Sequence, residues 1–143
     1  MKAIFYSIVL LYSNSALCYE MTDYDSIEKL KSLSPHSCQD IRNDDGYLGY
    51  LACTERVYED SDKLLQSKLK KFSIKIDKLE DIDISTRFKI YQDQWLKYRI
   101  SKCNFIASSA NTGSAVHNHL YQLCSLIENY NRITFFDQPL PVS

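Results

Sequence analysis

The sequence predicts a small all-α protein, an antiparallel three-helix bundle or hairpin with two disulfides, after a cleaved signal peptide. Apolar residues recur at helical spacing over three long segments. Four cysteines remain once the N-terminal segment is set aside, and that segment has the layout of a secretory signal. With 143 residues, 45% of them hydrophobic and 24% charged, the chain is large enough for one packed domain.

Residues 1–18 have the features of an export signal. Lys2 precedes an apolar stretch over residues 3–12, and Ala16 and Cys18 lie three and one positions before Tyr19. The stretch is well short of the roughly 20 apolar residues of a membrane-spanning helix. We therefore expect cleavage after Cys18, no transmembrane helix, and a periplasmic or secreted protein. Lipidation of Cys18 is the alternative, although Leu17 is larger than the residue that usually precedes a lipidated cysteine.

The remaining cysteines form an even set in a short exported chain, which is typical of two disulfides. They are Cys38, Cys53, Cys103 and Cys124. No two of them have the close spacing of zinc ligands. Three pairings are possible, and we favour the local ones, Cys38 with Cys53 and Cys103 with Cys124.

Residues 19–46 form a polar segment with a short helix at most, around residues 26–33, followed by a loop. Gly46 and Gly49 mark the entry to a long amphipathic helix from Tyr47 to about Leu79. Its predicted buried face consists of Leu48, Leu51, Tyr58, Leu65, Leu69, Phe72, Ile76 and Leu79.

Residues 77–85 interrupt this pattern, and Ser85 is a candidate cap for a second helix over about residues 86–108. That helix should bury Phe88, Tyr91, Trp95, Tyr98, Cys103 and Ile106. After small polar residues at 111–114, a third helix is expected over about residues 115–136, before two prolines stop it. Its predicted stripe is Leu120, Leu123, Cys124, Ile127, Asn131 and Thr134. The helical domain would span residues 47–138, with a short tail at 139–143.

A turn near residues 111–113 would make the second and third helices antiparallel neighbours. Cys103 lies about nine residues before this turn and Cys124 about twelve after it, so a rise of about 1.5 Å per residue puts them at nearly the same height. A disulfide between them is therefore geometrically reasonable.

No catalytic or metal-binding pattern stands out. His117 and His119 are two apart, and on a helix such positions point about 200° away from each other. The acidic pairs have no evident apolar pocket that would separate two pKa values. The formal net charge of −1 gives no basic patch for nucleic acid. We therefore expect no enzyme activity, no cofactor, no metal and no nucleic-acid partner.

Trp95, Arg99 and Cys103 are four residues apart and lie on one helix stripe. The architectural interpretation has Trp95 packed, Cys103 bridged, and Arg99 paired with a carboxylate or a helix end. The alternative places Arg99 on a partner-binding surface, where Trp, Tyr and Arg are common anchors.

This segment resembles the LprI-like lysozyme-inhibitor family, whose pattern is Gln-x-x-Trp-x-x-Tyr-Arg-x-x-x-Cys, then Gly-Ser, then Cys with Arg eight residues on. The matching residues are Gln92, Trp95, Tyr98, Arg99, Cys103, Gly113, Ser114, Cys124 and Arg132, and upstream Cys53, Tyr58, Asp62 and Leu64. The resemblance covers about residues 38–136. Leu65 and Asn129 depart from the Asn and Thr that are common at these positions.

The resemblance implies an exported bacterial helical domain that binds a protein partner, with inhibition of lysozyme as one role in the family. Lysozymes are typically cationic, so a negative surface would speed association. Our first expectation for such a surface is the N-terminal acidic group Asp23, Asp25, Glu28, Asp44 and Asp45. The competing hypothesis is an envelope interaction or assembly module that binds another protein or a cell-wall component.

Overall fold

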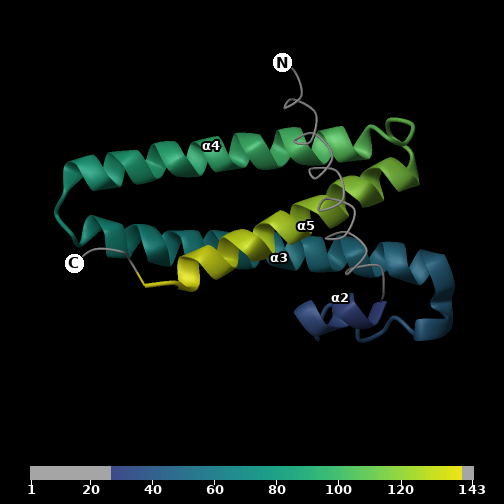
Figure 1. Cartoon of the computed structure of the whole chain (residues 1–143). Helices are drawn as coiled ribbons and strands as arrows, with labels where there is room; N and C mark the ends of the chain where they lie inside the picture. Colours follow the sequence, from purple (N-terminus) through teal and green to yellow (C-terminus); the bar gives the residue numbers. More distant parts are fainter. Residues whose placement is uncertain (1–26, 140–143) are drawn as a thin grey trace, which may run out of the picture.

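The computed structural model describes residues 27–139, and within them every regular element is helical (Figure 1). The elements are α2 (Ile27–Leu33), the 3-10 turn η1 (Asn43–Asp45), α3 (Gly46–Asp77), α4 (Ile82–Ala107) and α5 (Ala115–Asp137). The predicted all-α bundle of three long helices is confirmed, and the short helix expected around residues 26–33 is present as α2. The predicted signal peptide, residues 1–18, lies outside the described residues.

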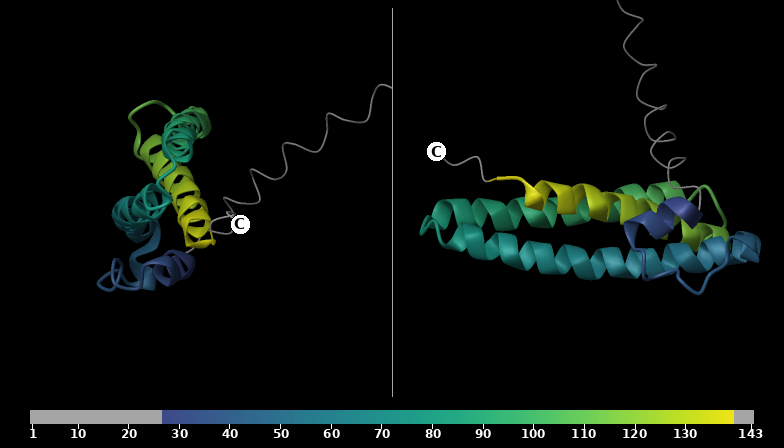
Figure 2. Two further views of the ribbon diagram at one scale, coloured as in Figure 1. Left: turned by 90° about the vertical axis from the view of Figure 1, so that its left-hand side faces the viewer. Right: turned by 90° about the horizontal axis from the view of Figure 1, so that it is seen from below.

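The three long helices run up, down and up, with short connections at both ends. Helices α3 and α4 are joined by residues 78–81, and α4 and α5 by residues 108–114. Helix α5 packs along both α3 and α4, whereas α3 and α4 touch each other much less (Figures 1 and 2). The short α2 lies against the first half of α3 (Figure 2). Helix α5 is therefore the central element of the bundle.

Helix α4 begins earlier than predicted because its cap is Asp81 and not Ser85. The Asp81 carboxylate accepts hydrogen bonds from the backbone N–H groups of Asp83, at 2.9 Å, and Ile84, at 3.0 Å. These donors have no partner within the helix, which is why an aspartate is favoured there. Ser85 lies in the first turn, where its hydroxyl donates to Asp77 at 2.9 Å and ties α4 to the end of α3.

The turn between α4 and α5 uses two residues of the family pattern. Gly113 has a φ of +79°, a conformation that glycine adopts at little cost. The hydroxyl of Ser114 then accepts a hydrogen bond from the backbone N–H of His117 at 3.1 Å and caps α5. Both residues serve the turn itself.

The core consists of two hydrophobic clusters. One joins α2, the following loop, α3 and α5 and contains Leu30, Cys38, Ile41, Tyr50, Cys53, Val57, Leu123, Leu126 and Ile127. The other joins α3 and α5 with partly buried residues of α4 and contains Leu65, Phe72, Ile76, Ile133 and Phe136. Among the described residues, none of the helices is long and apolar enough to cross a membrane.

Several predicted core positions are exposed. Leu48, 76% exposed, faces away from the line of Tyr50, Cys53 and Val57, and Leu79 follows the end of α3. Tyr91 and Tyr98 flank the buried stripe of α4, which contains Arg99 and Cys103. In α5, Asn131 and Thr134 are exposed, because the helix is buried on two sides instead of along one stripe.

Candidate functional site

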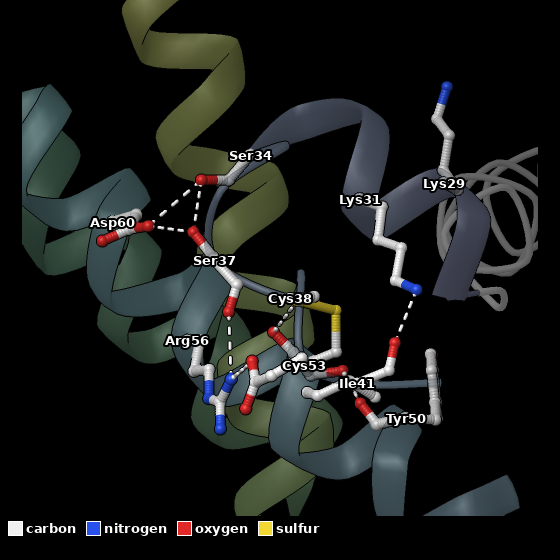
Figure 3. The surroundings of a disulfide bond; sticks show 12 residues. Lys29, Lys31, Ser34, Ser37, Cys38, Ile41, Tyr50, Cys53, Arg56 and Asp60 are labelled. Carbon is white, nitrogen blue, oxygen red and sulfur yellow. Dashed lines mark hydrogen bonds and ion pairs between the residues drawn. A yellow bond between two sulfur atoms is a disulfide. The ribbon is translucent and has the colours of Figure 1, made fainter. Parts of the chain in front are cut away.

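One end of the bundle is held together by a set of covalent and polar contacts, and we call residues 27–62 the clamped end. Its disulfide joins Cys38, in the loop after α2, to Cys53 in α3, which confirms the favoured pairing (Figure 3). Lys31 of α2 donates to the carbonyl oxygen of Ile41 at 2.6 Å. The loop is thus fixed to α2 on one side and to α3 on the other.

Asp60 of α3 fixes the start of the same loop. Its Oδ2 accepts hydrogen bonds from the hydroxyls of Ser34, at 3.1 Å, and Ser37 (Figure 3). One turn earlier, Arg56 donates to the carbonyl oxygen of Ser37 at 3.2 Å and forms an ion pair with Asp40 at 2.5 Å. Two successive turns of α3 therefore hold a loop that has no regular structure of its own.

These contacts favour the ionised carboxylates. The hydrogen bond from Ser37, followed by those from Ser34 and Lys63, lowers the pKa of Asp60 below its ordinary value. The hydrogen bond from Arg56 lowers the pKa of Asp40 in the same way. Because the folded state depresses both pKa values, this stabilisation is present at neutral pH and is lost as the pH falls through the folded-state pKa values.

We expect the free energy of unfolding to stay nearly constant from pH 8 to 6 and to fall below about pH 4, where carboxylates protonate. Chemical denaturation at each pH measures this. Because other carboxylates also titrate, the comparison that decides is with Asp60→Asn, which should lose less stability on acidification than the parent protein. Equal acid sensitivity of the two proteins would contradict the role of Asp60.

The clamped end is acidic. It carries eight acidic and four basic side chains, a formal net charge of −4. Of the predicted acidic group, Asp23 and Asp25 lie outside the described residues, and Glu28 is exposed. Asp44 forms an ion pair with Arg42 at 2.5 Å, and Asp45 accepts from the Arg42 backbone N–H at 2.8 Å.

The predicted acidic group does not include Glu55 and Glu59, two further acidic side chains of the clamped end that are exposed and one turn apart on α3. Their position outside the apolar stripe of the predicted helix is the signal that identifies them as exposed.

Several residues of the family pattern meet between the helices, and the first group of them joins the three long helices. Arg99 Nη1 of α4 donates to Asp62 Oδ1 of α3 at 2.9 Å and to Asn129 Oδ1 of α5. Asn129 Nδ2 donates to Asp62 Oδ1 at 3.0 Å and to Ser61 Oγ at 2.9 Å. We call these four residues the polar tie. Asn129, a departure from the family pattern, lies at its centre.

The second group surrounds Arg132 of α5. Its Nε and Nη2 donate to Gln92 Oε1 at 3.1 and 2.7 Å. Its guanidinium carbon lies over aromatic rings, 4.3 Å from the centroid of Tyr91 and 5.2 Å from that of Trp95. Burial lowers the pKa of Arg132, yet the ordinary value is so far above neutral pH that the side chain stays charged.

The third group lies near the turn between α4 and α5. Cys103 is bonded to Cys124, which confirms the pairing predicted from helix geometry. Beside it, Lys102 donates to Glu128 at 2.6 Å, with both side chains largely buried, and lies 5.9 Å from the ring centroid of Tyr98. Tyr98 itself is exposed.

These contacts support the architectural interpretation of Arg99, whose side chain is only 10% exposed. Most of the pattern residues therefore place α3, α4 and α5 relative to one another, whereas Leu64 and Tyr98 are exposed.

The two histidines of α5 have different surroundings. His119 is buried and its ring packs against Tyr50, with 4.8 Å between ring centroids, whereas His117 is half-buried. Within residues 27–139, no group of three or more His, Cys, Asp and Glu side chains could hold a metal ion.

Comparison with known proteins identifies a family. The family model described as "Lysozyme inhibitor LprI" matches residues 38–135. No curated protein and no solved structure matches the chain. The matched region begins at Cys38 and ends at Phe135, so it includes both disulfides and the polar tie.

Proposed function

The chain belongs to the LprI family of lysozyme inhibitors, and we propose that it is an exported protein that inhibits lysozyme by binding to it. The observation that carries this proposal is the family match over residues 38–135. Two disulfides in so short a chain support an oxidising compartment outside the cytoplasm. The predicted signal peptide, residues 1–18, would direct the protein there and be removed.

We place the lysozyme-binding surface on the clamped end. Lysozymes are typically cationic, and complementary charge speeds association and selects the orientation of the partners. Residues 27–62 have a formal net charge of −4, whereas residues 63–139 carry +5. The clamped end is also held by a disulfide and by the contacts of Asp60 and Arg56, so that little order has to be gained on binding.

The test is a lysozyme activity assay with the purified, oxidised protein, at low and moderate salt, against chicken-type and goose-type enzymes. We expect dose-dependent inhibition that weakens as salt is added, because screening reduces the attraction between opposite charges. No inhibition at micromolar excess would contradict the proposal and favour an envelope interaction module instead.

Charge reversal should locate the surface. Asp44 and Asp45 are poor choices, because both make contacts with Arg42 that order η1. We expect the double variant Glu55→Lys and Glu59→Lys to weaken inhibition by roughly tenfold at low salt, since both side chains are exposed. The matched control is Glu80→Lys and Asp93→Lys, which makes the same change in net charge outside the clamped end. Equal weakening by both double variants would show that net charge alone matters.

A further inference from the structure

The second half of α3 has an outer surface dominated by lysines. Between residues 63 and 78 there are six lysines and a single acidic residue, Asp77. Exposed side chains recur there at helical spacing, which places them along one side of the helix. We call this surface the lysine face, and it consists of Lys63, Lys70, Lys71, Ile74, Lys75 and Lys78.

The lysine face is long and uncovered in the described structure. The opposite side of the same helix buries Leu65, Phe72 and Ile76 in the core, so the lysines point away from the bundle. The short α2 lies against the first half of α3, as the right-hand view of Figure 2 shows. From residue 63 to residue 78 the helix extends about 22 Å.

Folding alone does not account for this concentration of lysines. Lys63 pairs with Asp60 at 3.5 Å, and Lys68 pairs with Asp137. No ion pair within residues 27–139 involves Lys70, Lys71, Lys75 or Lys78. Like charges three and four positions apart repel each other on a helix. The helix dipole favours a positive charge only in the last turn, where Lys75 lies.

Exposed apolar side chains accompany the lysines. Ile74, in the middle of the face, is 48% exposed, and Ile82, at the start of α4, is 85% exposed. Two of the acidic groups near this turn are engaged locally, Asp81 as the cap of α4 and Asp83 in an ion pair with Arg87. Lysines with interspersed apolar side chains are typical of surfaces that lie on a membrane, where ammonium groups meet phosphates and apolar groups enter the interface.

We propose that the lysine face of α3 binds the surface of a bilayer that contains anionic phospholipids. The choice of partner follows from charge complementarity, and the exposed isoleucines favour a bilayer over a linear polyanion. The lysine face lies along the second half of α3, whereas Glu55 and Glu59 lie in the first half. The protein can therefore bind a membrane through the lysine face and a cationic partner through the clamped end.

Vesicle co-sedimentation tests the proposal with the purified, oxidised protein. The vesicles contain phosphatidylcholine alone or with phosphatidylglycerol, at low and at physiological salt. We expect binding only when phosphatidylglycerol is present, and weaker binding at higher salt. The double variant Lys70→Gln and Lys71→Gln should bind roughly 25-fold more weakly, at about fivefold for each lysine.

The matched control is Lys89→Gln and Lys97→Gln, which removes the same charge from α4 and should bind like the parent protein. Absence of binding to phosphatidylglycerol vesicles at low salt would overturn the proposal, as would equal weakening by the two double variants. A soluble polyphosphate that binds the protein as well as the vesicles do would assign the face to a linear polyanion instead. Ile74→Ser should weaken vesicle binding but leave any polyphosphate binding unchanged.

Discussion

Replacing Arg99 with alanine is expected to lower the free energy of unfolding by about 3 kcal/mol, because it leaves buried polar partners unsatisfied. Arg99 is the only residue of the polar tie that belongs to α4. Its loss would leave Asn129 Oδ1 without the hydrogen bond from Arg99, and the side chain of Asn129 is fully buried. Asp62 is partly exposed, so water replaces part of the interaction that it loses with Arg99. We therefore place the loss of unfolding free energy at the lower end of the range for broken buried ion pairs. Denaturant unfolding of the oxidised protein measures the change.

The control for Arg99 is Lys97→Ala. Lys97 lies two residues away on the same helix and pairs with Asp93 at 2.7 Å, but its side chain is 75% exposed. An exposed pair of this kind contributes little, so we expect a change within about 0.5 kcal/mol. Equal stability of the two variants would contradict a stabilising role of the polar tie. Additive effects of Arg99→Ala and Asp62→Ala on the free energy of unfolding would contradict it as well, since residues that share one contact should couple.

Removal of the Cys103–Cys124 disulfide is the second large expected effect. The bond closes a loop with a sequence separation of 21 and lies between α4 and α5. In the chain-entropy treatment, a loop of this length gives about 3 kcal/mol of stabilisation, because the unfolded chain is restricted. We therefore expect Cys103→Ala with Cys124→Ala to lower the unfolding midpoint substantially, measured by circular dichroism in parallel with the parent protein.

The comparison for this variant is Cys38→Ala with Cys53→Ala. That bond holds the loop after α2 to α3, and α2 makes contacts with α3 but is not part of the α4–α5 hairpin. Its removal should loosen the clamped end and weaken lysozyme inhibition, while most of the helical signal remains. If the Cys103–Cys124 variant unfolds at the same midpoint as the oxidised parent protein, the bond does not stabilise the hairpin.

Helix periodicity and the spacing of Cys103 and Cys124 were sufficient to predict three helices and the disulfide between them. They were insufficient to predict which residues are buried in α5. A periodic pattern assumes one buried side, whereas α5 lies against both α3 and α4 and buries every residue from Leu123 to Asn129. The predicted burial of Asn131 and Thr134 is therefore wrong.

The polar tie shows a different limit of sequence reasoning. The sequence indicated that Arg99 needs a carboxylate or a helix end, but the partners Asp62 and Asn129 are 37 and 30 residues away. These side chains come into contact because three helices are aligned along the bundle axis, and no local sequence pattern specifies that alignment. The uneven distribution of charge along α3, in contrast, follows directly from the order of its residues. The net charge of the whole chain, −1, gives no indication of it, because the acidic and basic parts nearly cancel.

Amide hydrogen exchange of the oxidised protein, with and without lysozyme, shows whether the clamped end binds the enzyme. We expect slower exchange in peptides from residues 38–62 when lysozyme is present, and no change in peptides from residues 63–78. Slower exchange at residues 63–78 alone, or no change anywhere at saturating lysozyme, would rule out binding through the clamped end.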